Sequence, residues 1–252
     1  MENLKVTSFA EFVDICISDD FSCGHVVYRG VEDSNYKLIP TIGRITQYQG
    51  TLEYMLYREQ DIFRQFKLRS INLLRREPRN DWEWLSVAQH HGLPTRLLDW
   101  TSSPLIAAYF ATKPFLKDDG ELCEPSCSAA VYALHTCSTI DIDREPSIFK
   151  YKKNGLFFPP HITPRIVGQS GLFSVQSNPM IEYQEDFADF EESGGWVKKL
   201  VLDRDVAMEI QKTLYLLGIK QSLLFPDLDG FANEIKIKEV LGGHFYSQHE
   251  LP

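Results

Sequence analysis

The chain has 252 residues, of which 43% are hydrophobic and 24% charged, a composition typical of a folded globular protein. Its formal net charge of -9 argues against a general polyanion-binding protein, because phosphate contacts need an excess of Lys and Arg. No stretch approaches the roughly 20 apolar residues of a membrane helix, and the first residues lack the apolar core of a signal peptide. We therefore expect a cytoplasmic chain with no membrane partner.

The cysteines are scattered along the chain, and their odd number, 5, does not describe a disulfide framework. Cys123 and Cys127 are followed by His135 and Cys137, and four such groups are a possible zinc ligand set. Their spacings fit no standard zinc pattern, so we predict free thiols in a reducing compartment and no bound metal.

The first half of the chain mixes helical and extended patterns. Residues 7–17 predict a short amphipathic helix, and 25–28 a strand that delivers Arg29 at its end. The longest helical pattern runs from Thr51 to Arg76, with Thr51 as its N-cap. Its polar face carries a basic stripe that would meet an anionic partner or lie in solvent. Exposed charge is the default on an amphipathic helix, which favours the solvent-exposed face.

The next elements surround a short polar segment. Asp81 to His91 predicts a helix with Asp81 as its N-cap and Gly92 just past its end. Thr95 to Trp100 is predicted to be extended. A helix over Pro104 to Thr112 follows, because Pro is favoured in the first turn and the preceding hydroxyl residues are good caps.

The second half of the chain supplies most of the strands. We predict strands over residues 129–135, 165–167, 172–175 and 198–202, an acidic surface loop over 182–192, and helices over 205–217 and from Gly230 to about Val240. There is no regular β-α-β alternation and no internal repeat. The pattern therefore predicts an α+β fold, which we treat as one domain over 1–252 with its core at about 22–240.

The densest group of polar side chains lies between Ala88 and Ser102. Consecutive His90 and His91 cannot share one helix face, so we expect one to be buried and hydrogen-bonded and the other to face a cleft. Asp99 has two interpretations that stay open. It is either a structural residue that caps a helix or pairs with an Arg such as Arg96, or a catalytic carboxylate.

Arg29, followed by Gly30, suits an anion, because the guanidinium offers a bidentate fork and glycine permits close approach of a backbone. The alternative is a structural ion pair at the end of a strand, and the local sequence does not decide between the two. Asp227 begins a segment too short for a calcium loop, so we predict a turn or capping role. The P-loop, G-x-S-x-G, G-x-G-x-x-G and H-E-x-x-H motifs are all missing from the sequence.

Several motifs together resemble the FRG domain family, which is named for an aromatic-Arg-Gly triplet. The matching segments are Tyr28-Arg29-Gly30, Leu38-Ile39-Pro40 with Arg44, Gln89 to Thr101, Ala107 to Ala111, Pro164 to Phe173, and Leu223 to Gly230. The resemblance extends over roughly residues 22–235, most of the chain.

The layout of this family is similar to that of the ADP-ribosyltransferase superfamily. The resemblance implies a split, mixed or antiparallel sheet with helices early and late in the chain. It implies that Arg29 holds a phosphate or ribose of NAD, that Thr101 or Ser102 lies on a second strand, and that residues 165–169 form a third strand. The implied NAD contacts come from Tyr28, Arg29, Gly30, Gln89, His90, His91, Thr95, Arg96 and Ser102.

The third strand carries Gln169 where the superfamily has Glu. A neutral amide keeps a hydrogen bond but loses the charge that stabilises a developing cation. Transfer chemistry would then need Asp99, His90 or His91 to supply the missing base.

Three hypotheses follow. The first is an NAD-using ADP-ribosyltransferase or NAD-cleaving enzyme, such as a toxin or phage-defence effector, with catalytic Arg29, Thr101, Gln169 and Asp99 and a protein or nucleic-acid acceptor. The second is a non-catalytic module that binds a nucleotide or a partner protein. The third is a metal-dependent nuclease that uses Asp99, Asp227 and the histidines.

Overall fold

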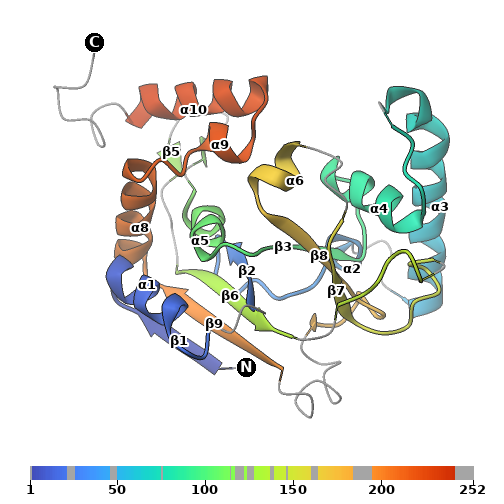
Figure 1. The fold of residues 1–252 in the computed structure, drawn as a ribbon, viewed down its shortest axis with the longest axis horizontal. Helices are drawn as coiled ribbons and strands as arrows, with labels where there is room; N and C mark the ends of the chain where they lie inside the picture. Colours follow the sequence, from blue (N-terminus) through green and yellow to red (C-terminus); the bar gives the residue numbers. More distant parts are fainter. Residues whose placement is uncertain are drawn as a thin grey trace.

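The fold is given by a computed structural model (Figure 1). It describes residues 2–21, 26–45, 50–74, 76–113, 115–116, 122–123, 128–136, 139–145, 147–159, 164–183 and 195–241. These residues form a mixed α/β structure with a seven-stranded sheet. A separate two-stranded ribbon pairs β4 (Phe115–Leu116) with β5 (Leu122–Cys123). Within the described part of the chain, no helix combines the length and apolar character that crossing a bilayer requires.

The large sheet has the strand order β1-β9-β6-β2-β3-β8-β7. Its strands are β1 (Glu2–Val6), β2 (Val26–Val31), β3 (Leu97–Thr101), β6 (Ala129–His135), β7 (Gly155–Phe157), β8 (Gly171–Val175) and β9 (Trp196–Leu202). Strands β1 and β9 are parallel, and every other neighbouring pair is antiparallel. The sheet is therefore mixed, which is one of the two forms expected from the sequence.

The sheet is narrowly joined between β2 and β3. Their pairing has one register position, Tyr28 opposite Thr101. By contrast, β2 pairs with β6 along the whole of Val26–Val31, and β3 pairs with β8 along the whole of Leu97–Thr101. Past that single pair the two strands part, so their facing edges are open to side chains and to a ligand.

Helices cover the two halves of the sheet separately, as Figure 1 shows. The helices are α1 (Phe9–Ile17), α2 (Thr41–Arg44), α3 (Leu52–Ser70), α4 (Asp81–His90), α5 (Pro104–Thr112), α6 (Pro164–Gly168), α8 (Arg204–Leu216), α9 (Gln221–Leu224) and α10 (Leu228–Leu241). Buried residues of α1, α5 and α8 share one core with β2, β6 and β9. Buried residues of α3 and α4 share another with β3, β7 and β8. A third core joins buried residues of β2 and β6 with buried residues of β3, β7 and β8. The parting of β2 from β3 therefore lies between two helix layers, over a core that both halves of the sheet share.

Most predicted elements occur near the expected residues, and α5 and β6 have the predicted bounds. The predicted strand over 165–167 is wrong, because these residues lie in α6 and the strand begins at Gly171. Ile166 and Val167 favour a strand locally, but Pro164 suits a first helical turn. Gly168 also packs close to the Leu223 carbonyl, where a Cβ would lie 2.8 Å away. Tertiary packing thus overrides local propensity here.

One strand was missed, and two further predictions need correction. Strand β1 was not predicted, and its pairing with β9 depends on residues about 200 positions apart. The N-cap of α4 is Asn80, whose side chain accepts from the Glu83 amide, and not Asp81. Helix α3 ends at Ser70 and continues as a 3-10 turn, so the predicted helix to Arg76 is too long. The predicted acidic loop lies outside the described residues after Tyr183.

Acidic partners occupy part of the predicted basic stripe on α3. Arg58 and Arg64 both pair with Asp61, at 3.7 and 3.2 Å, and Lys67 pairs with Asp81 at 3.1 Å. These ion pairs favour the ordinary solvated helix face over an anion-binding stripe.

Candidate functional site

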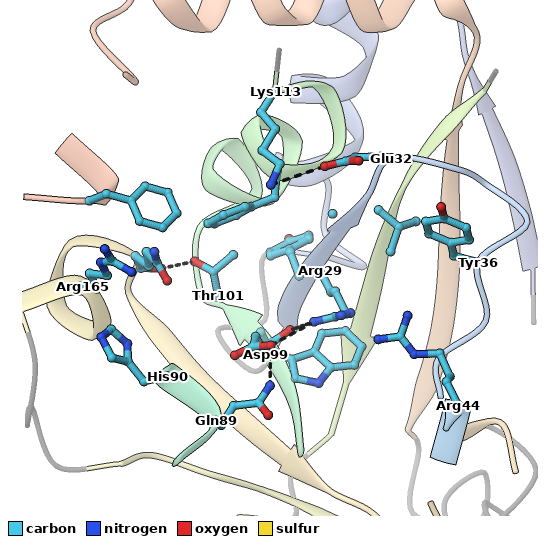
Figure 2. A pocket seen from close by; sticks show the side chains of 17 residues that line it. Arg29, Glu32, Tyr36, Arg44, Gln89, His90, Asp99, Thr101, Lys113 and Arg165 are labelled. Carbon is cyan, nitrogen blue, oxygen red and sulfur yellow. Dashed lines mark hydrogen bonds and ion pairs between the residues drawn. The ribbon is translucent and has the colours of Figure 1, made fainter. Parts of the chain in front are cut away.

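A pocket of about 440 Å³ opens where β2 and β3 part (Figure 2). Its lining residues come from both halves of the sheet and from the helices around them. They are Tyr28, Arg29, Gly30, Val31, Glu32, Tyr36, Arg44, Gln89, His90, Asp99, Trp100, Thr101, Phe110, Lys113, Arg165, Gln169 and Phe225. Eight of the predicted site residues therefore meet in one cavity (Tyr28, Arg29, Gly30, Gln89, His90, Asp99, Thr101 and Gln169).

The three residues of the aromatic-Arg-Gly triplet make different contacts. Tyr28 is buried and forms the single pair with Thr101. Gly30 lies against the backbone of α5, where a Cβ would come within 1.9 Å of the Ala107 carbonyl oxygen. Arg29, between them, directs its guanidinium into the gap between the strands and donates to the Asp99 carbonyl at 2.7 Å. The small residue at 30 thus lets α5 approach β2 closely at the wall of the pocket.

Arg29 lies next to a second guanidinium. Burial lowers the pKa of Arg29 and nearby Arg44 lowers it further, while Asp99 raises it. Figure 2 shows Arg44 directed toward Arg29. Asp99 lies 3.6 Å from Arg29, but Arg44 has no ion pair within the described part of the chain and donates to Thr41 Oγ1. The pair of cations therefore has one carboxylate partner, an arrangement that favours an anionic ligand.

The polar segment after α4 forms a chain of hydrogen bonds that ends at Asp99. The Thr95 hydroxyl donates to Gln89 Oε1 at 2.6 Å, and Gln89 Nε2 donates to Asp99 Oδ2 at 2.9 Å. The Leu97 amide donates to the Thr95 hydroxyl at 3.1 Å, so the hydroxyl proton is directed toward Gln89. Buried Thr95 consequently sets the orientation of the Gln89 amide, and the amide holds the Asp99 carboxylate.

Thr101 and Gln169 meet at one end of the pocket, but by way of the backbone. The Thr101 hydroxyl donates to the Gln169 carbonyl at 2.7 Å and accepts from the Ser103 amide. Gln169 Nε2 donates to the Leu224 carbonyl at 3.2 Å. Thr101 therefore connects the loop before β8 to β3, and its hydroxyl proton is used in the hydrogen bond to the Gln169 carbonyl.

The two histidines have different surroundings. His90, the last residue of α4, is half-buried and lines the pocket, whereas His91 is exposed. The expectation that one of them is buried is therefore wrong, while the expectation that one faces a cleft is confirmed. The pKa of His90 is lowered by burial and by His91 and Arg165, against the opposite effect of Asp99 and Asp227. The lowered pKa favours the uncharged form of the His90 imidazole at neutral pH.

Four predicted contact residues do not line the pocket: His91, Thr95, Arg96 and Ser102. Arg96 is 2% exposed, and its Nε and Nη2 donate to Glu59 Oε2 at 2.8 and 2.5 Å. Arg96 is thus part of a buried ion pair, and Asp99 pairs with Arg29 instead of with it. Ser102 is exposed and donates its amide to the Ser170 carbonyl.

Sequence reasoning missed the other charged residues of the pocket. Lys113 lies 3.4 Å from Glu32, and Arg165 contacts Asp227 at 2.6 Å while stacking over Phe225 at 5.1 Å. Asp227 also accepts from the Gly230 amide, which confirms the predicted turn role. The signal was available for Arg44, Arg165 and Phe225, since all three lie in the segments that resemble one family.

Part of the possible zinc ligand set lies outside the described residues. Cys127 and Cys137 lie outside the described residues, and the side chain of Cys123 is not described. Among the described residues, no group of three or more His, Cys, Asp or Glu side chains is arranged to hold a metal ion.

Fold and pocket together define a mixed α/β protein with a cationic cavity between two half-sheets. Comparison with protein-family models matches the FRG domain over residues 24–120. The chain therefore contains an FRG domain, and Arg29, Arg44 and the segment Gln89–Thr101 lie within it. Arg165, Gln169 and Phe225 line the same pocket from beyond the matched segment. No curated protein and no solved structure matches the chain.

Proposed function

We propose that this pocket binds a nucleotide through its phosphates, with NAD or a related nucleotide as the candidate ligand. The observation that carries the proposal is the pair formed by Arg29 and Arg44. Both line the pocket, and Asp99 alone among the described carboxylates pairs with them. A diphosphate supplies the missing negative charge and accepts from planar guanidinium groups at several oxygens.

The remaining walls suit the rest of a nucleotide. Tyr36, Phe110 and Phe225 supply aromatic faces that can stack on a base, and Phe110 lies 6.1 Å from Phe225 between ring centroids. The volume of about 440 Å³ falls within the range of small-molecule sites. The pocket provides a local cationic site in a chain whose formal net charge is -9.

Calorimetric titration tests the proposal with inorganic pyrophosphate, ADP, ADP-ribose and NAD. We expect the wild type to bind at least pyrophosphate and ADP, and Arg44→Gln to weaken both by about tenfold, the loss of one charge-assisted contact. Arg64→Gln is the matched control, because Arg64 is 74% exposed on α3, outside the pocket. Binding of none of the four compounds, or equal loss in the two variants, contradicts the proposal.

A second candidate function is ADP-ribosyl transfer or NAD cleavage on an ADP-ribosyltransferase-like fold. Asp99 favours it, because this carboxylate is 59% exposed and is held by Gln89 and Arg29 in the proposed nucleotide pocket. In the proposed step the bond from ribose C1′ to the nicotinamide nitrogen breaks, and its electron pair leaves with nicotinamide. A hydroxyl oxygen of water or acceptor bonds to C1′ and its proton passes to neutral His90. Asp99 would stabilise the positive charge that develops at C1′.

Labelled NAD, incubated with protein and nucleic-acid extracts, tests this second candidate. We expect released nicotinamide or transferred label, both reduced by at least about a hundredfold in Asp99→Asn, the loss typical of a charge-stabilising group. If NAD binds but neither product forms, the result would support the hypothesis of a non-catalytic nucleotide-binding module. A role as a toxin or phage-defence effector would depend on this activity. We do not propose the nuclease, because Asp227 is engaged by Arg165 and Gly230.

A further inference from the structure

The carboxylates around the pocket are matched one to one by cations. Asp99 lies 3.6 Å from Arg29, and Glu32 lies 3.4 Å from Lys113. Asp227, which is not a lining residue, lies 2.6 Å from Arg165. Arg44 is the cation left over among the described lining residues. The pocket therefore has an excess of positive charge near Arg29, and each described carboxylate around it is paired with a neighbouring cation.

The end of the pocket at Gln169 is polar, and the described charges near it are paired. Gln169 Nε2 donates to the Leu224 carbonyl, and no described residue donates to its Oε1. Nearby, the Phe225 ring lies against Arg165, whose charge meets Asp227. Oε1 therefore offers an acceptor for a hydroxyl or amide N–H of a ligand. Among the described residues, no unmatched carboxylate lies at this end to attract a cationic ring.

We propose that the pocket selects a nucleotide diphosphate whose second moiety is uncharged, and that Gln169 determines this selectivity. The preferred ligands are ADP-ribose and the reduced dinucleotide NADH, and NAD, with its cationic nicotinamide ring, binds more weakly. This inference rests on the proposed nucleotide binding and adds which class of nucleotide is bound. The phosphates lie at Arg29 and Arg44, and a ribose hydroxyl or carboxamide donates to Gln169 Oε1.

NADH and NAD form a suitable pair of probes, because they differ by one hydride at the ring and by one unit of charge. Both are titrated calorimetrically, together with ADP-ribose and ADP, against the wild type, Gln169→Glu and Gln169→Met. Gln169→Glu places a carboxylate at nearly the same position. Gln60→Glu adds the same charge at an exposed position of α3 and is the control. Chemical unfolding of each variant shows whether it is folded.

We expect the wild type to bind NADH and ADP-ribose about tenfold more tightly than NAD, the effect of one modest charge interaction. Gln169→Glu should lower the NADH-to-NAD affinity ratio about tenfold, and Gln60→Glu should leave it unchanged. Gln169→Met should weaken the binding of ADP-ribose, because the hydrogen-bond acceptor is lost, and should leave the binding of ADP unchanged.

Equal or tighter binding of NAD by the wild type overturns the inference, and so does a ratio that Gln169→Glu leaves unchanged. Either result, with ADP still bound, leaves the proposed nucleotide binding intact. Binding of none of the four ligands removes the proposed function and the inference together. Should Gln169→Glu fail to fold, the wild-type ratio and Gln169→Met still decide.

Discussion

The guanidinium of Arg29 donates to the main-chain carbonyl of Asp99 at 2.7 Å, across the gap where β2 and β3 part. The bond satisfies a carbonyl that a neighbouring strand would otherwise pair. It also holds the guanidinium at the wall of the pocket, where Arg44 lies opposite. One side chain thus closes the sheet and provides a cation for a ligand, so the two alternatives left open for Arg29 both apply.

The contact between Gly30 and α5 predicts a strong effect of a single methyl group. Gly30→Ala should lower the free energy of unfolding by about 3 kcal/mol, because its Cβ would lie 1.9 Å from the Ala107 oxygen and 2.6 Å from the Ala111 nitrogen. Urea unfolding measures the change. Gly50→Ala is the control, since no heavy atom lies within 4 Å of its Cβ position. Equal effects at the two positions would show that α5 can shift away from β2 at little cost in free energy.

The buried ion pair of Arg96 and Glu59 predicts a structural role for Arg96. Arg96→Met should lower the free energy of unfolding by about 3–5 kcal/mol, because it leaves the Glu59 carboxylate buried without its partner. The double variant Glu59→Met with Arg96→Met should regain much of this loss. Thermal and urea unfolding measure both. A single variant as stable as the wild type would contradict the buried pair, and exposed Arg144→Met is the control.

The hydrogen bonds from Thr95 to Gln89 and Asp99 predict an effect at a distance. Thr95→Val removes the hydroxyl that orients the Gln89 amide, so pyrophosphate affinity should fall several-fold as Asp99 and Arg29 lose their fixed positions. Thr95→Ser keeps the hydroxyl and should restore the affinity. Calorimetry measures the binding, and unfolding of both variants separates it from stability. Equal weakening by Val and Ser would argue for packing of the Thr95 methyl group instead.

The pKa of His90 predicts a pH dependence of stability. Burial, His91 and Arg165 lower this pKa below 6.5, against Asp99 and Asp227. Between the folded-state pKa and 6.5, the unfolded chain binds more protons at this site than the folded chain does. The free energy of unfolding should therefore fall as the pH drops through this window, and level off below it.

His90→Gln should remove that part of the pH dependence, as urea unfolding at a series of pH values would show. NMR titration of the His90 ring gives its pKa directly. A titration midpoint at or above 6.5 in the folded protein would contradict the prediction.

The sequence by itself determined the local elements and the residues that gather at the site. Capping residues and periodicity give α5 and β6 their bounds, and the Tyr28–Gly30 and Gln89–Thr101 motifs supply most of the predicted pocket residues. The bounds of α5 and β6 could be predicted because they depend on neighbours a few positions apart, whereas the pocket residues were implied by the resemblance to the FRG domain family. The same local reasoning wrongly predicted a strand over residues 165–167, which lie in α6, because the β-branched residues at 166 and 167 were given more weight than Pro164.

The tertiary structure alone decided which polar residues face the pocket and which are used to hold the fold. Arg96 and Asp99 are only three residues apart in the sequence. Arg96 nevertheless forms a buried ion pair with Glu59 of α3, while Asp99 lines the cavity. Arg44, Lys113 and Arg165 reach that cavity from segments far apart in the sequence. The physical reason is that charge pairing and the parting of β2 from β3 depend on contacts between distant residues, which no local pattern encodes.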